Sequence, residues 1–186
     1  MKTVQLLSLG GFAALYLTLA QIGVAFIYIF GLPPGTGGII NILWSATIPV
    51  IAVLVVRRFW AATIMLTIYY ALALPLPIGG TPGFFPKILL GIVGGFSIDV
   101  IYYLFKRNRA LASVLMAAVS QVVLGFSVVV FGSIFSMPGV EKIEAAILKP
   151  QVLLFAFVVS GLLGFSAWLT YKKIEKTSVV RRIQSE

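Results

Sequence analysis

One acidic residue, Asp99, stands inside a long apolar stretch that runs from about residue 88 to residue 105. A carboxyl group is costly in hydrocarbon, so its side chain must face other helices, a cavity or a partner protein. Three roles fit it: a proton relay, a coupling contact, or an acid hydrogen-bonded to a neighbouring helix. Proton coupling usually needs a second acid or a base nearby, and the same layer of the sequence offers neither.

A second set of residues has the types that line small-molecule pockets. Such pockets combine apolar and aromatic walls with a few fixed polar groups. The candidates for substrate binding are Tyr28, Asn41, Trp44, Phe84, Phe85, Lys87, Gln121 and Gln151. An alternative needs no ligand, because Trp and Tyr also gather where a membrane meets water. That alternative accounts for Tyr28 and Trp44.

The residue types on which many enzymes depend are missing. The chain has no cysteine and no histidine, which excludes thiolate and imidazole catalysis and ordinary zinc sites. Acid–base or nucleophilic catalysis requires at least two converging groups, and Asp99 has no candidate partner. No glycine-rich phosphate loop is present either. We therefore expect a protein that is not an enzyme and that uses no metal or cofactor.

Membrane-spanning helices are the elements that must position these residues. Six apolar stretches run about 4–30, 39–56, 59–78, 88–105, 110–135 and 151–171. A helix that rises ~1.5 Å per residue crosses the ~30 Å hydrocarbon core with stretches of this length. Since 60% of the residues are hydrophobic, an ordinary soluble domain is excluded. We expect an all-α polytopic membrane protein whose residues 1–186 form a single six-helix transmembrane domain.

Basic residues are unevenly divided between the two sides of this six-span arrangement. Of the 14 lysines and arginines, only Lys87, Lys142 and Lys149 fall on one side, which leaves 14 − 3 = 11 on the side of both termini. Loops rich in Lys and Arg stay in the cytoplasm, so we expect a cytoplasmic (plasma) membrane protein with both termini inside. Nucleic-acid binding requires a basic patch with readout groups on a folded surface, and we do not expect it here.

The segments expected to face outward differ in character. Residues 31–38 and 75–86 are rich in proline and glycine, which end helices and permit tight turns. They could form a structured lid or serve simply as helix punctuation. Residues 136–150 alternate charged and apolar side chains in a way that predicts a short amphipathic helix at the interface. The polar tail after Tyr171 is expected to extend the last helix.

Small residues recur four apart in two of the stretches. Gly10, Ala14 and Thr18 form such a row in the first, and Gly91 and Gly95 do so in the fourth. Small residues allow helix backbones to approach closely in lipid. Such a row either holds the bundle together internally or docks a separate membrane subunit.

The chain resembles the substrate-binding S component of energy-coupling factor (ECF) transporters, which are vitamin importers related to ABC systems. The resemblance covers residues 37–131 best. It lies in the Gly-Gly-Ile-Ile-Asn-Ile-Leu-Trp run from residue 37, in Arg57-Arg58, and in the run from Gly83 to Asp99 that leads to Lys106-Arg107. The nearest branch is the one that handles thiamine or its precursor. The Gly10/Ala14/Thr18 row is similar to the motif with which S components contact a coupling subunit.

This resemblance implies a membrane subunit that captures a small nutrient from outside. Loops 31–38 and 79–86 would roof the pocket, and a transmembrane coupling subunit with cytosolic ATPases would drive transport. The thiamine branch carries acids near its pocket to hold a cationic ligand, and this chain has none in either loop. A neutral or anionic substrate is therefore favoured. The alternatives are a structural or assembly subunit without a ligand and, third, a proton-coupled transporter that acts alone through Asp99.

Overall fold

The computed structural model describes residues 1–31 and 36–185, without the side chains of residues 27, 28, 36–39 and 142. All regular structure in these residues is helical, which confirms the all-α class. The eight helices are α1 (Thr3–Phe30), α2 (Thr36–Val56), α3 (Ala61–Leu72), α4 (Lys87–Phe105), α5 (Arg109–Ile134), α6 (Val140–Ile147), α7 (Pro150–Ile174) and α8 (Ser178–Ser185).

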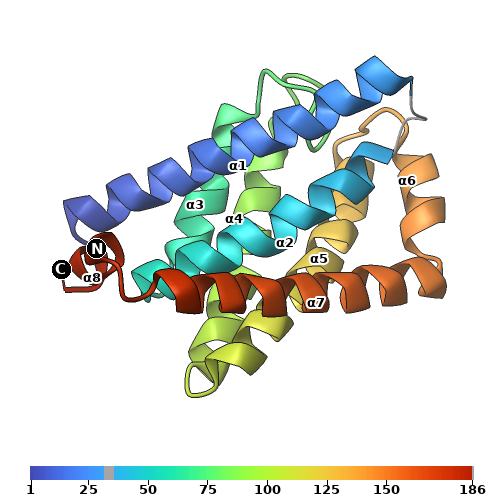
Figure 1. Cartoon of the computed structure of the whole chain (residues 1–186). Helices are drawn as coiled ribbons and strands as arrows, with labels where there is room; N and C mark the ends of the chain where they lie inside the picture. Colours follow the sequence, from blue (N-terminus) through green and yellow to red (C-terminus); the bar gives the residue numbers. More distant parts are fainter. Residues whose placement is uncertain (32–35, 186) are drawn as a thin grey trace.

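The six longest helices close into a ring in the order α1, α2, α7, α5, α4, α3 and back to α1. Figure 1 shows α1, α2 and α7 lying alongside one another, with both termini at the same end of the bundle. Helix α2 contacts every other member of this ring. Its second half is accordingly apolar on all sides, with Val50 and 52–56 buried and Ile51 half-buried. A helix that is hydrophobic all round is one that neighbours cover on all sides.

Four helices are long and apolar enough to cross a membrane by length and composition: α1, α4, α5 and α7. They carry exposed Leu, Ile and Phe side chains on their outer faces, as a lipid-facing surface requires. These four helices indicate a multi-pass membrane protein. The apolar part of α2 with described side chains, Ile40–Val56, and α3 are shorter.

The third apolar stretch folds differently from the single helix that the sequence predicts over 59–78. Helix α3 has 12 residues, or ~18 Å of helix, and ends at Leu72. Pro75 and Pro77 follow, and a residue before proline avoids the helical conformation. The chain then turns through residues 73–86, where Gly79, Gly80 and Gly83 adopt positive φ angles.

Two shorter helices complete the ends of the bundle. Helix α6 lies within 136–150, which confirms the short helix expected there. The tail does not simply extend the last helix, because α7 ends at Ile174 and α8 is separate. Helix α8 buries Val180 and Ile183 beneath the bundle. Gln184 Nε2 donates to the Val55 carbonyl oxygen at 3.2 Å and Gln5 Nε2 donates to that of Ile183 at 3.3 Å, so α8 joins the ends of α1 and α2.

Helices α3 and α4 approach each other so closely that glycine is required between them. A Cβ atom on Gly95 would lie 2.4 Å from the Thr63 Cα, and one on Gly91 would lie 2.7 Å from the Leu66 carbonyl oxygen. Both neighbours are backbone atoms, which a side-chain rotation cannot move. Gly91 and Gly95 therefore pack inside the bundle, one of the two roles expected for small-residue rows.

Gly95→Ala should destabilise the protein by about 1–3 kcal/mol, because the added methyl group forces the two backbones apart. Gly11→Ala is the matched control, since a Cβ there meets no described atom within 4 Å. The control should be neutral or slightly stabilising, because alanine favours helix over glycine. Thermal unfolding in detergent measures both. Equal melting temperatures for the two variants would contradict the close packing.

Candidate functional site

Asp99 is fully buried on α4, and its carboxylate faces the first turn of α3. It accepts hydrogen bonds from the Ala62 N–H at 3.0 Å, the Thr63 N–H at 2.9 Å and the Thr63 hydroxyl at 2.7 Å. The first N–H groups of a helix lack partners within the helix, and an anion there interacts favourably with the helix dipole. The N-cap residue, Trp60, has a left-handed backbone and makes no side-chain cap bond. Asp99 therefore caps α3 from the neighbouring helix.

Lys87 acts at the opposite end of α3. Its side chain is fully buried, and Nζ donates to the carbonyl oxygens of Leu76 at 2.7 Å and Ala73 at 3.4 Å. Ala73 is the C-cap of α3, where carbonyl groups lack helical partners and a cation is favourable. The substrate-binding role expected for Lys87 would have to compete with these two hydrogen bonds.

Four residues of α4 line up along α3 and form what we call the α3 seam: Lys87, Gly91, Gly95 and Asp99. Each is four residues after the previous one, so all four lie on one face of α4. Asp99 lies twelve residues after Lys87, a distance along α4 close to the length of the 12-residue α3. One face of α4 thus provides a cap for each end of α3 and two glycines for the contact between them.

Two of the candidate substrate-binding residues bury a polar atom for which the described residues provide no hydrogen-bond partner. These atoms are Asn41 Oδ1 and Gln121 Nε2. Asn41 Oδ1 lies against α1, where a Cβ on Gly23 would come within 2.9 Å of it. Ser160 Oγ, fully buried on α7, also has no hydrogen-bond partner among the described residues. Buried polar groups cost free energy unless water or a ligand satisfies them.

The other candidates do not come together. Trp44 is half-buried and packs against the core. Phe84 is half-buried beside Gly80, while Phe85 and Gln151 are exposed. The side chain of Tyr28 lies outside the described residues, as do residues 32–35 of the expected roof.

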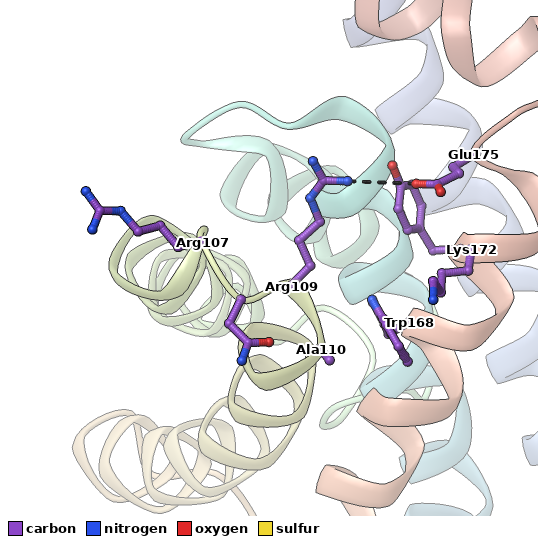
Figure 2. A pocket seen from close by; sticks show the side chains of 8 residues that line it. Arg107, Arg109, Ala110, Trp168, Lys172 and Glu175 are labelled. Carbon is purple, nitrogen blue, oxygen red and sulfur yellow. Dashed lines mark ion pairs between the residues drawn. The ribbon is translucent and has the colours of Figure 1, made fainter.

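Two shallow cavities open at the surface of the described structure, and none of the candidate substrate-binding residues lines either one. The first, of about 350 Å³, is apolar and is lined by Phe59, Val100, Tyr103 and Leu104. The second, of about 480 Å³, is polar and lies between the α4–α5 turn and the end of α7 (Figure 2). Both lie toward the end of the bundle that holds the α4–α5 turn.

A group of buried tyrosines was not among the residues chosen from the sequence. The rings of Tyr16 and Tyr69 stack with centroids 3.9 Å apart, and Tyr70 meets Tyr69 edge-on at 4.9 Å. All three are buried, Tyr16 and Tyr69 between α1 and α3 and Tyr70 against Gly79 and Gly91. The sequence signal that could have indicated this group is the pair of adjacent tyrosines, Tyr69 and Tyr70, in the middle of an apolar stretch. Ser160 gave none, because a single serine in an apolar helix is common.

The small-residue row on α1 differs from those inside the bundle. Ala14 and Thr18 are exposed and Gly10 is half-buried. A Cβ added to Gly10 or Gly11 meets no described atom within 4 Å, whereas one on Gly164 would lie 2.3 Å from the Ser113 carbonyl oxygen. The α1 row therefore lies on the outer surface of the described bundle.

Comparison of the chain with protein-family models, with curated proteins and with solved structures finds no match. Among the described residues there is also no group of three or more acidic side chains that could hold a metal ion.

Asp99→Ala should destabilise the protein by about 2–4 kcal/mol, because it leaves two buried N–H groups and a hydroxyl without an acceptor. Asp99→Asn retains one acceptor oxygen and should therefore lose less stability than Asp99→Ala. Thermal unfolding in detergent gives both values. Ser97→Ala is the control, because the Ser97 hydroxyl binds only its own helix at the Gly94 carbonyl oxygen. An Asp99→Ala protein as stable as Ser97→Ala would refute the capping role.

Proposed function

We propose that the chain is the substrate-capture subunit of an ECF-type importer for a vitamin or another small organic nutrient. A transmembrane coupling subunit and cytosolic ATPases would supply the energy. Six crossings would place both termini in the cytoplasm, with α3 and the turns through residue 86 together forming the third crossing. Contacts among the ends of α1, α2, α7 and α8 support this topology, because they gather the basic termini at one end of the bundle.

The observation that carries the proposal is the open small-residue row on α1. Gly91, Gly95 and Gly164 are covered by neighbouring helices of the same chain, but Ala14 and Thr18 face outward. A smooth helix face of small residues allows another membrane helix to approach closely. A coupling subunit is the partner that this face would accept.

The unsatisfied amide and hydroxyl groups support ligand capture. Asn41 Oδ1, Gln121 Nε2 and Ser160 Oγ offer an acceptor, a donor and a hydroxyl in the apolar interior. The two charges buried in the spans, Lys87 and Asp99, are already used by the α3 seam. The interior therefore offers neutral groups, and we infer a neutral polar substrate rather than a cation such as thiamine.

Ala14→Leu should abolish docking of the coupling subunit, because the larger side chain prevents close approach of its helix. Protein purified from its native membrane should then carry at least tenfold less of the associated ATPase module. Ser166→Leu, on an exposed part of α7, is the matched control and should retain that module. Recovery of the wild type without any ATPase module, repeated across preparations, would overturn the proposal.

Asn41→Leu should lower the occupancy of a co-purified neutral ligand about tenfold or more, since a buried hydrogen bond to the ligand is lost. Native mass spectrometry of protein from its native membrane gives the occupancy. Thr47→Val controls for changes on α2, because its hydroxyl binds only the Leu43 carbonyl oxygen at 2.7 Å. A ligand retained equally by both variants would place the binding site away from Asn41.

A structural or assembly subunit is the second candidate. The observation that favours it is the absence, among the described cavities, of one lined by the candidate binding residues. Such a subunit would dock through the same face of α1 but would contain no small molecule. The two candidates therefore differ in the ligand and not in the partner contact.

A further inference from the structure

The polar cavity lies at the end of the bundle that carries the basic α4–α5 turn. Its lining includes Arg107 and Arg109 from that turn and the start of α5, and Trp168, Lys172 and Glu175 from the end of α7. Figure 2 shows Arg109 reaching over the cavity toward Glu175, with Lys172 beside Trp168 on the facing helix. The guanidinium of Arg107 extends away from the cavity in the same view.

Positive charge exceeds negative charge around this cavity. Arg109 and Lys172 face one acid, Glu175, and 2 − 1 leaves a net charge of +1, to which Arg107 adds a further positive charge at the edge of the cavity. The only ion pair among these residues joins Arg109 Nη1 to Glu175 Oε2 at 3.8 Å, with both side chains partly exposed. A loose, solvated pair of this kind contributes little free energy. Arg109 therefore remains available to another anion.

The position of the cavity at the ends of long apolar helices favours a lipid headgroup as its occupant. It lies where α4 ends, α5 begins and α7 approaches its end, and all three are among the long apolar helices. Phe165 and Leu169 of α7 and Leu111 of α5 are exposed close by in the sequence. The Lys172 Nζ lies 4.6 Å from the centroid of the Trp168 ring. Tryptophan with adjacent lysine is typical of the level at which hydrocarbon gives way to headgroups.

We propose that this cavity binds the phosphate of an anionic phospholipid, with Arg109 and Lys172 as the contacting cations. Phosphate oxygens accept strong hydrogen bonds from guanidinium and ammonium groups. The first turn of α5, which reaches the cavity at Ala110, adds backbone N–H groups that lack helical partners. The acyl chains would lie on the exposed apolar surface of α5 and α7, which a free phosphate ion would not use. The proposal holds for either candidate function.

Native mass spectrometry in detergent tests it, with phosphatidylglycerol and phosphatidylcholine of identical acyl chains as probes. The wild type should prefer phosphatidylglycerol. A basic residue near a membrane surface contributes about 1 kcal/mol, or about fivefold, to binding an anionic lipid. The Arg109→Gln/Lys172→Gln variant should therefore lose about 10- to 30-fold in affinity for phosphatidylglycerol, with phosphatidylcholine unchanged.

Arg181→Gln/Arg182→Gln removes the same charge from exposed positions of α8 that do not line the cavity, so its affinity for phosphatidylglycerol should stay within about threefold of that of the wild type. Glu175→Gln provides a gain of function, because it removes the one negative charge that lines the cavity and should tighten phosphatidylglycerol binding severalfold. This variant keeps the test valid if the double variant at the cavity unfolds.

Three outcomes would overturn the proposal. One is equal binding of the two lipids by the wild type, and another is an equal loss in the two double variants. The third is displacement of the lipid by soluble glycerol phosphate at equal concentration, which would identify a site for free phosphate instead.

Discussion

A helix of 12 residues in an apolar bundle must have the polar groups at both of its ends satisfied by something other than itself, and α3 depends on α4 for this. Asp99 supplies the acceptor for the N-terminal turn, and Lys87 donates to the carbonyl oxygens of the C-cap Ala73 and of Leu76 in the turn beyond it. Between them, Gly91 and Gly95 allow the backbones to touch. The negative charge lies at the N-terminus of α3 and the positive charge at its C-terminus, and both positions interact favourably with the helix dipole. The two charges and the two glycines therefore all stabilise the packing of α3 on α4.

This constraint determines what the interior can offer a ligand. Because the α3 seam uses both charges buried within the spans, the buried polar atoms left without a partner in the described helices are those of Asn41, Gln121 and Ser160, with Arg57 Nε in the same state just past the end of α2. Lys87 also holds the turn after α3 through the Leu76 carbonyl oxygen. That turn begins the segment expected to roof a pocket, so its start is anchored to the helix below it. The outer surface of α1 remains for a partner and the basic cavity remains for lipid.

Much of the helical arrangement could be predicted from hydrophobic runs bounded by charges. The 88–105 stretch corresponds to α4, and the amphipathic pattern in 136–150 corresponds to α6. The length of α3 could not be read from apolar content, because Pro75 and Pro77 end the helix within an apolar run. The sequence also could not identify which helix faces Asp99. It contained the four-residue spacing from Lys87 to Asp99, but only the packing shows that α3 occupies that face.

Amide hydrogen exchange by NMR in detergent micelles tests the α3 seam most directly. First-turn amides of a helix usually exchange rapidly because they lack hydrogen-bond partners. The Ala62 and Thr63 amides, which donate to Asp99, should instead exchange as slowly as amides in the middle of α3. Exchange of Ala62 and Thr63 as rapid as that of Ala110, in the first turn of α5, would contradict the account.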